Sequence, residues 1–216
     1  MKMEIDEMIE ILEKVHGSKK SAMTEVSEIR EDPFMVLISC ILSLRTKDEV
    51  TIKASKRLFK LADTMEGISK LSTEEIEDAI YPVGFYKTKA ERIKQISLDL
   101  IEKYDSKVPD SIEELMKLKG VGRKTANIVI TIGFGKLGIA VDTHVHRISN
   151  RLGYVSTKKP DDTEFELRKK LPKRHWIRYN DLLVLHGKSI CTPISPKCSI
   201  CPIYDYCMRV GVEKSR

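Results

Sequence analysis

The sequence lacks the features that mark membrane and secreted proteins. No apolar run in its 216 residues is long enough to cross a bilayer, and the chain begins with an acidic amphipathic stretch rather than a secretory signal. Low-complexity segments, solenoid repeats and the alternating pattern of β-strands are also missing. We therefore expect a cytoplasmic, intracellular protein without membrane contact, and an all-α fold.

A large charge excess of one sign is also missing. The chain has 38 basic and 32 acidic residues, so its net charge of +6 is by itself weak evidence for an anionic partner. Hydrophobic residues make up 41% of the chain and charged residues 32%, which is typical of a globular protein. The length suits one large or two small domains.

Helical periodicity, in contrast, extends over nearly the whole chain. The run 34–42 is apolar almost all round and follows Asp32-Pro33, so it predicts a helix at the centre of a core. Cys40 within it is expected to be ordinary core packing. The first helix is predicted to turn one face inward: Ile5, Met8, Ile9, Leu12 and Val15.

The ends of other helices are also marked. Ser72 and Glu75 form a capping box that predicts a short helix after them. Further helices are expected at about 87–104, 163–171 and 176–189, from the spacing of their apolar residues.

The most informative stretch is 118–129, which is typical of a helix-hairpin-helix DNA-binding element. One helix is expected to end near Leu118 and the next to begin near Arg123. The glycines between them permit the positive φ of a tight turn, and they leave N–H groups open at the positive start of the second helix. A phosphate fits such a site. The expected DNA contacts of this hairpin are Gly120, Val121, Gly122 and Arg123.

Other glycine motifs fit this stretch less well. A plain loop between helices would require no partner. A dinucleotide-binding fingerprint requires a preceding strand and a third glycine, and Thr125 stands in place of that glycine. A P-loop requires glycine directly before Lys-Thr, where this chain has Arg123. The small Ala126, which lets two helices approach closely, and the fixed spacing favour the hairpin.

Four of the five cysteines lie within residues 191–207. In a reducing compartment, such a group is more typical of a metal site than of disulfides. Four thiolates suit structural zinc or a [4Fe–4S] cluster, and ligand count alone leaves both open. The predicted ligands are Cys191, Cys198, Cys201 and Cys207.

Taken together, these segments resemble the endonuclease III family, the DNA glycosylase/AP lyases of base-excision repair. The resemblance rests on residues 118–129, 141–144 and 185–188, and on the cysteine spacing. It covers nearly the whole chain. It implies that the cysteines hold a structural [4Fe–4S] cluster rather than zinc.

The resemblance also implies a fold of two helical domains. Residues 25–136 would form the domain with the hairpin, and residues 1–24 with 137–216 the domain with the cluster. The implied partner is double-stranded DNA with damaged bases or abasic sites, bound by a monomer, and the implied lesions are oxidised or saturated pyrimidines. A monofunctional glycosylase of the same fold and a non-enzymatic DNA-binding module are the alternatives.

For catalysis, the resemblance implies that Lys124 is the nucleophile and Asp142 the second catalytic residue. The Lys124 amine would attack the sugar carbon that bears the damaged base, form a Schiff base, and cleave the strand on the 3′ side by β-elimination. A lysine must be neutral to attack, and a positive helix end disfavours its ammonium form. Asp142 can stabilise positive charge on the sugar and also cap the helix that begins after it.

Chemistry on a stacked base requires extrusion of the nucleotide, and something must fill the gap. By the same resemblance, Phe85 would be the apolar wedge, and Arg45 stands where the family normally has a glutamine. A buried core role is the alternative for Phe85. His144 is expected to line the pocket. Lys197 is expected to contact phosphate from the cluster loop, unless it is only a solvated loop charge.

Overall fold

The computed structural model describes residues 4–17 and 32–216. Every regular element in these ranges is helical, which confirms the all-α prediction. Across the same ranges, none of the helices combines the length and the apolar character that a bilayer crossing requires. The predicted domain boundary between residues 24 and 25 lies outside the described residues.

Contacts along the chain divide it into two compact units. Met1–Ser21 and Leu137–Arg216 form the unit that contains the four clustered cysteines, and we call it the cluster unit. Ala22–Lys136 form the unit that contains the hairpin, and we call it the hairpin unit.

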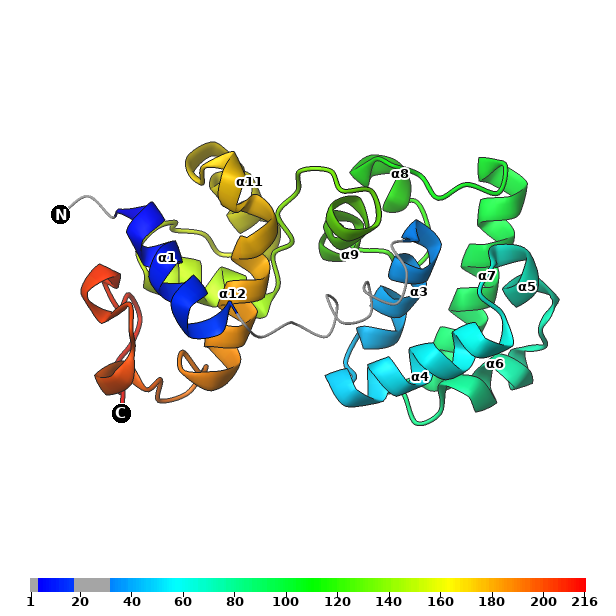
Figure 1. Ribbon diagram of the computed structural model, residues 1–216, viewed down its shortest axis with the longest axis horizontal. Helices are drawn as coiled ribbons and strands as arrows, with labels where there is room; N and C mark the ends of the chain where they lie inside the picture. The colour runs from blue at the N-terminus through cyan, green and yellow to red at the C-terminus, as the bar shows by residue number, and fades with distance from the viewer. Residues whose placement is uncertain (1–3, 18–31) are drawn as a thin grey trace. The chain divides into compact units, whose positions relative to one another are not determined.

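The hairpin unit is built around α3 (Pro33–Ser43). Every residue of α3 from Phe34 to Leu42 is buried, as the apolar run predicted, and Cys40 is part of this core. Asp32 caps the helix because its carboxylate accepts a hydrogen bond from the N–H of Phe34 at 2.8 Å. Four elements pack against α3: α4 (Asp48–Leu61), α7 (Tyr86–Tyr104), α9 (Arg123–Ile128) and the π-helical turn η1 (Val129–Gly133) (Figure 1).

The remaining helices among the described residues of the hairpin unit are short. They are α5 (Met65–Lys70), α6 (Thr73–Ile80) and α8 (Ile112–Leu115), and both α5 and α6 pack against α7. The predicted capping box forms at the start of α6. Ser72 Oγ accepts from the N–H of Glu75 at 3.1 Å, and the Glu75 carboxylate accepts from the N–H of Ser72 at 2.7 Å.

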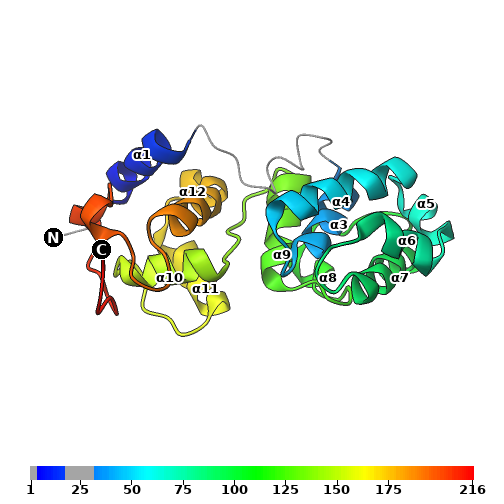
Figure 2. The same cartoon turned by 90° about the horizontal axis from the view of Figure 1, so that it is seen from below.

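The cluster unit has four helices and three 3₁₀ turns among its described residues. They are α1 (Ile5–His16), α10 (Thr143–Arg151), α11 (Pro160–Lys170), η2 (Lys173–His175), α12 (Trp176–Ser189), η3 (Cys198–Ile200) and η4 (Tyr204–Tyr206). Helix α12 packs against both α1 and α10, and α10 also packs against α11 (Figure 2). The core between them contains Met8 and Leu12 of α1, Val145 and Ile148 of α10, and Leu182 of α12.

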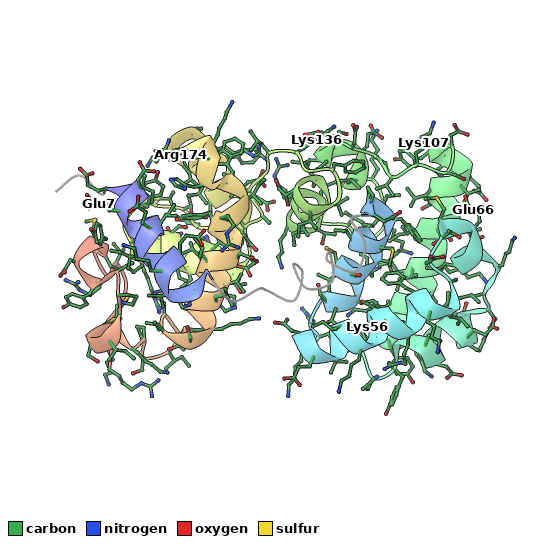
Figure 3. The ribbon with its side chains drawn as sticks, viewed as in Figure 1. Glu7, Lys56, Glu66, Lys107, Lys136 and Arg174 are labelled. Atoms are coloured by element: carbon green, nitrogen blue, oxygen red, sulfur yellow. The ribbon has the colours of Figure 1, made fainter. Side chains whose placement is uncertain are left out.

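Polar side chains of α1 bind it to later parts of the same unit. Asp6 pairs with Arg174 of η2 at 2.6 Å, and the hydroxyl of Tyr206 donates to Glu7 at 2.8 Å; Glu7 and Arg174 are labelled in Figure 3. The first helix is therefore an integral part of the unit that holds the cysteines.

Two local predictions are corrected by the structure. Val15, predicted to face inward, is exposed, and its neighbour His16 is buried instead. The reason is a tertiary contact, because His16 Nε2 lies 3.3 Å from His186 Nδ1 of α12. The helix predicted at 163–171 begins earlier, at Pro160, because proline suits the first position of a helix.

Candidate DNA-binding hairpin, gap-filling loops and metal centre

The predicted hairpin connects α8 to α9. Its turn is closed by the N–H of Val121, which donates to Leu118 O at 3.0 Å. Gly120 has a φ of +85°, whereas Gly122 has an extended conformation with φ −93° and is the N-cap of α9. Of the two glycines, only Gly120 therefore uses the positive φ that the turn was predicted to require.

The two glycines also differ in their surroundings. A Cβ at Gly120 would lie 2.4 Å from Arg92 Nε, because the side chain of Arg92 on α7 packs against the turn. At Gly122 no atom lies within 4 Å of a Cβ position. Since the N–H groups in the first turn of a helix have no acceptor within that helix, the open space at Gly122 leaves them accessible to an anion.

Lys124 lies in the first turn of α9, as predicted, and it is partly buried. Its positive charge acts on the thiol of Cys40 in α3; burial raises the pKa of that thiol to about 12, and the charge of Lys124 opposes the rise. The next residues, Thr125 and Ala126, are buried, and Ala126 is fully covered. The small residue therefore lies at a helix contact, as the sequence suggested.

Asp142 belongs to the cluster unit and caps α10. Its carboxylate accepts hydrogen bonds from the N–H groups of His144 at 2.8 Å and Val145 at 2.9 Å, which confirms the predicted N-cap. The carboxylate is partly exposed, so one oxygen is held by the helix while the group remains accessible.

Arg45 and Phe85 come together in the hairpin unit. Arg45 Cζ lies 5.8 Å from the centre of the Phe85 ring, and Phe85 is 64% exposed. The core alternative for Phe85 is therefore wrong. Both residues have left-handed backbone conformations, with φ of 52° and 59°. Such conformations cost free energy in residues other than glycine, and they persist where the surrounding structure enforces them.

Lys89 of α7, which is not among the predicted site residues, helps to hold these backbone conformations. Lys89 is 4% exposed, and its ammonium donates to Leu42 O at 2.8 Å, Leu44 O at 2.5 Å and Thr46 Oγ1 at 3.1 Å. Burial, and secondarily the charge of Arg92, lower the pKa of Lys89 to about 8. A sequence signal exists in retrospect, because Lys89 follows Phe85 by one helical turn on the inward face of α7.

The four clustered cysteines line a single pocket together with His186, Lys197 and apolar side chains of α10. None of the five cysteines of the chain forms a disulfide, so the disulfide alternative does not occur. Burial raises the pKa of Cys201 to about 11 and also raises the pKa of Cys207. A metal that binds these sulfurs as thiolates must displace their protons.

The surroundings of the sulfurs fit a thiolate-bound cluster. Arg151 Nη1 donates to Cys191 Sγ at 3.4 Å, and the backbone N–H of Arg209 donates to Cys207 Sγ at 3.4 Å. N–H donors of this kind stabilise negative charge on metal-bound sulfur. Four partly buried sulfurs thus line one pocket, two of them with N–H donors, and His186 Nε2 lies 3.6 Å from Cys201 Sγ.

Two arginines of α10 hold the loop that contains Cys191. Arg147 donates to Cys191 O at 2.8 Å, and Arg151 donates to Thr192 O at 2.7 Å. His144 Nδ1 lies 3.2 Å from the Arg147 guanidinium, and Gly187 of α12 leaves room for both side chains. Neither arginine is among the predicted site residues, although their spacing of one helical turn places both on one face of α10.

Lys197 lies in the loop between the first two clustered cysteines. Its backbone N–H donates to Ile190 O at 3.0 Å, which gives this loop a fixed attachment to the end of α12. Arg45 and Phe85 are thus brought together in one unit and the four cysteines in the other, and Lys124 and Asp142 belong to different units.

The helices, the hairpin and the cysteine site define a class of protein, the helix-hairpin-helix proteins of base-excision DNA repair. A sequence model of the HhH-GPD superfamily of base excision DNA repair proteins matches residues 38–173. A second model, the iron–sulfur binding domain of endonuclease III, matches residues 191–207. This second match begins and ends at the outermost of the four cysteines, and it favours iron–sulfur over zinc.

Individual relatives agree with these matches. Endonuclease III of Thermotoga maritima is 53% identical over 176 residues, which are 82% of this chain and 83% of that protein. The chloroplastic endonuclease III homolog 1 of Arabidopsis thaliana is 41% identical over 86% of this chain, which spans 51% of its length. A solved structure of a trapped endonuclease III–DNA covalent intermediate superposes with a TM-score of 0.85 and 35% identity, over 97% of this chain and 96% of that one. The chain belongs to the endonuclease III family of bifunctional DNA glycosylase/AP lyases, with the family's iron–sulfur domain at residues 191–207.

Proposed function

We propose that this chain removes oxidised or saturated pyrimidines from duplex DNA and cleaves abasic sites, with Lys124 as the nucleophile. The observation that carries the proposal is the position of Lys124, partly buried in the first turn of α9 directly after the hairpin. The likeness to a trapped endonuclease III–DNA covalent intermediate supports it, since such an intermediate requires a nucleophile.

The proposed reaction proceeds in two stages. The neutral Lys124 amine bonds to the sugar carbon that bears the damaged base, and the base leaves with the electrons of the broken bond and takes up a proton. The bond from that carbon to the ring oxygen then breaks, the oxygen takes up the proton that the amine releases, and a Schiff base forms. The Schiff base loses a proton from the neighbouring sugar carbon, and the electrons of that C–H bond expel the 3′ phosphate. Water hydrolyses the Schiff base and frees Lys124. The Asp142 carboxylate stabilises the positive charge that develops on the sugar.

The DNA contacts that we propose come from both units. Phe85 and Arg45 fill the gap left by the extruded nucleotide, with Arg45 bonding to the orphaned base. His144 lines the pocket beside Asp142, and Lys197 binds a phosphate. The hairpin supplies the remaining phosphate contacts through Gly120, Val121, Gly122 and Arg123. We further propose that the protein acts as a monomer on chromosomal DNA inside the cell.

The four clustered cysteines are proposed to hold a [4Fe–4S] cluster as thiolates. When bound, the cluster supplies a crosslink among four cysteines whose segment contains only two 3₁₀ turns. Cys191, Cys198, Cys201 and Cys207 are the ligands in this proposal, and Arg151 stabilises the charge on the first of them.

Borohydride trapping on an abasic duplex tests the assignment of the nucleophile. Lys124→Gln is expected to abolish the trapped complex and strand cleavage while it largely spares DNA binding, because the phosphate contacts come from backbone N–H groups. Lys119→Gln is the matched control, since it removes one exposed hairpin lysine and should leave trapping intact at saturating enzyme. Trapping by Lys124→Gln at the wild-type rate would identify another amine as the nucleophile.

A panel of duplexes that each carry one lesion tests the substrate proposal. Saturated and oxidised pyrimidines are expected to be cleaved faster than oxidised purines or mismatched thymine. Single-turnover rates provide the measurement, and a preference for a purine lesion would overturn the proposed substrate class. Sedimentation of the DNA complex tests the monomer.

A further inference from the structure

The α3–α4 loop (44–47) and the α6–α7 loop (81–85) are joined through the hydroxyl of Thr46. Thr46 Oγ1 accepts from the Lys89 ammonium at 3.1 Å and from the N–H of Gly84 at 3.2 Å, and it donates to Leu44 O at 3.2 Å. A hydroxyl has one proton and two lone pairs, so all of its hydrogen-bonding capacity is used.

The Lys89 ammonium likewise uses its full capacity. Its three N–H donors meet three acceptors, which are Leu42 O, Leu44 O and the hydroxyl of Thr46. Leu42 O lies at the C-terminal end of α3, where carbonyls lack helical partners and the helix dipole favours a cation. The lysine therefore completes the end of α3 and reaches into the α3–α4 loop at the same time.

The same contacts surround the two strained residues. Arg45 lies between Leu44 and Thr46, which are both bonded to Lys89. The carbonyl of Phe85 accepts from the backbone N–H of Lys89 at 3.0 Å. At Gly84, a Cβ would lie 2.7 Å from Arg45 O, so the two loops approach more closely than any other residue there would allow.

We propose that Lys89 is a positioning residue that holds the two loops at one separation, so that Arg45 and Phe85 enter the DNA as a preformed pair. The inference deepens the proposed function, because it rests on the gap-filling role of that pair. The benefit is preorganisation, since loops that are already ordered lose less entropy when they meet DNA. Lys89 itself touches neither the lesion nor the nucleophile.

The critical experiment compares duplex DNA with single-stranded DNA. An abasic site in a single strand has no opposite base that could be left unpaired, and no duplex base stack has to be disrupted to reach it. Its reaction with Lys124 therefore does not need the gap-filling pair. Lys89→Met keeps the length of the side chain and removes its donors. It is expected to slow the single-turnover rate on a duplex lesion by about tenfold or more, and to leave borohydride trapping on a single-stranded abasic site within about twofold.

Two further variants separate positioning from a loss of folding. Thr46→Val removes the hydroxyl but not the buried charge, and Thr46→Ser restores the hydroxyl. Gly84→Ala removes no hydrogen bond and pushes the loops apart. We expect Thr46→Val and Gly84→Ala to show the same duplex-specific defect, and Thr46→Ser to recover most of the rate that Thr46→Val loses. Circular dichroism establishes that each variant is folded.

A double-mutant cycle links Lys89 to the pair. If Lys89 acts through the pair, the loss of duplex rate caused by Lys89→Met should be smaller in the Phe85→Ala background than in the wild type. Additive losses, equal losses on single and double strands, or wild-type duplex rates in folded Thr46→Val would each overturn the inference. Failure of the proposed function would give different results. Either the wild type would form no borohydride-trapped complex with single-stranded or duplex DNA, or Phe85→Ala would leave the rate on duplex lesions unchanged.

Discussion

The hairpin unit and the cluster unit keep their functional segments in place by different means. In the hairpin unit, side chains of α7 support both the hairpin and the loops that contain Arg45 and Phe85, through Arg92 packed against Gly120 and through the buried ammonium of Lys89. In the cluster unit, the segment after α12 contains only two 3₁₀ turns, and large apolar side chains such as Ile194 and Met208 are 86% and 70% exposed.

The two units obtain their order from different sources. A segment that buries little apolar surface cannot offset its conformational entropy by packing alone. The cluster unit therefore depends on the metal centre and on the arginines of α10 for the shape of residues 190–207. In the hairpin unit, by contrast, α3 supplies a continuous apolar core.

The largest effect that would expose this contrast is expected from removing one thiolate. Cys201→Ser should abolish the brown colour and the bound iron, and residues 190–216 should become sensitive to protease while the hairpin unit stays resistant. Visible absorption, iron content and limited proteolysis of protein prepared without air provide the measurement. Cys40→Ala is the control, since Cys40 is buried in α3 and should not affect iron. A colourless wild type that carries one zinc per chain would disprove the cluster.

A second effect separates structure from recognition within the hairpin. Gly120→Ala must adopt a positive φ and meets Arg92, so it is expected to lower the free energy of unfolding by about 1–3 kcal/mol. Gly122→Ala has open space and should change that free energy by less than about 1 kcal/mol. It should nevertheless weaken DNA binding about tenfold, because a methyl group enters the space a phosphate would occupy. Urea unfolding measures the free energy of unfolding of each variant, and DNA titration measures its affinity. Equal losses of stability in Gly120→Ala and Gly122→Ala would contradict the prediction.

A smaller effect tests whether the cluster loop contacts the DNA backbone. Lys197→Ala should weaken binding to lesion and undamaged duplexes alike, and should flatten the slope of log K against log salt by about one unit. Lys158→Ala removes the same charge from an exposed site in the same unit and should leave the slope unchanged. A loss confined to lesion DNA would show that Lys197 is no general phosphate contact.

The smallest effect concerns pH and the buried ammonium. The pKa of Lys89 is lowered from 10.5 to about 8 in the folded protein, so between these values the unfolded chain binds a proton that the folded chain has released. The free energy of unfolding contributed by this group is therefore constant below pH 8 and rises with pH up to 10.5. Lys89→Met lacks this contribution. The stability difference between wild type and variant should grow across that window in urea unfolding, and a difference independent of pH would contradict the assignment.

Much of the architecture could be predicted from the sequence because it depends on neighbouring residues. The caps at Asp32, Ser72 and Asp142 bond to N–H groups two or three residues later, so they can be recognised from spacing alone. The start of α9 at Arg123 follows from the glycine before it. The cysteines predict a metal site because all four potential ligands lie within one short segment.

The helices, the hairpin and the four-cysteine site thus follow from local sequence. Which polar side chains are buried as anchors depends on contacts between distant parts of the chain. Lys89 has acceptors that lie 43 to 47 residues earlier in the chain, and Arg92 packs against Gly120 of a distant turn. His16 is buried in place of Val15 because His186 lies opposite it. Burying a charged or polar group costs free energy unless partners surround it, and only folding brings such distant partners together.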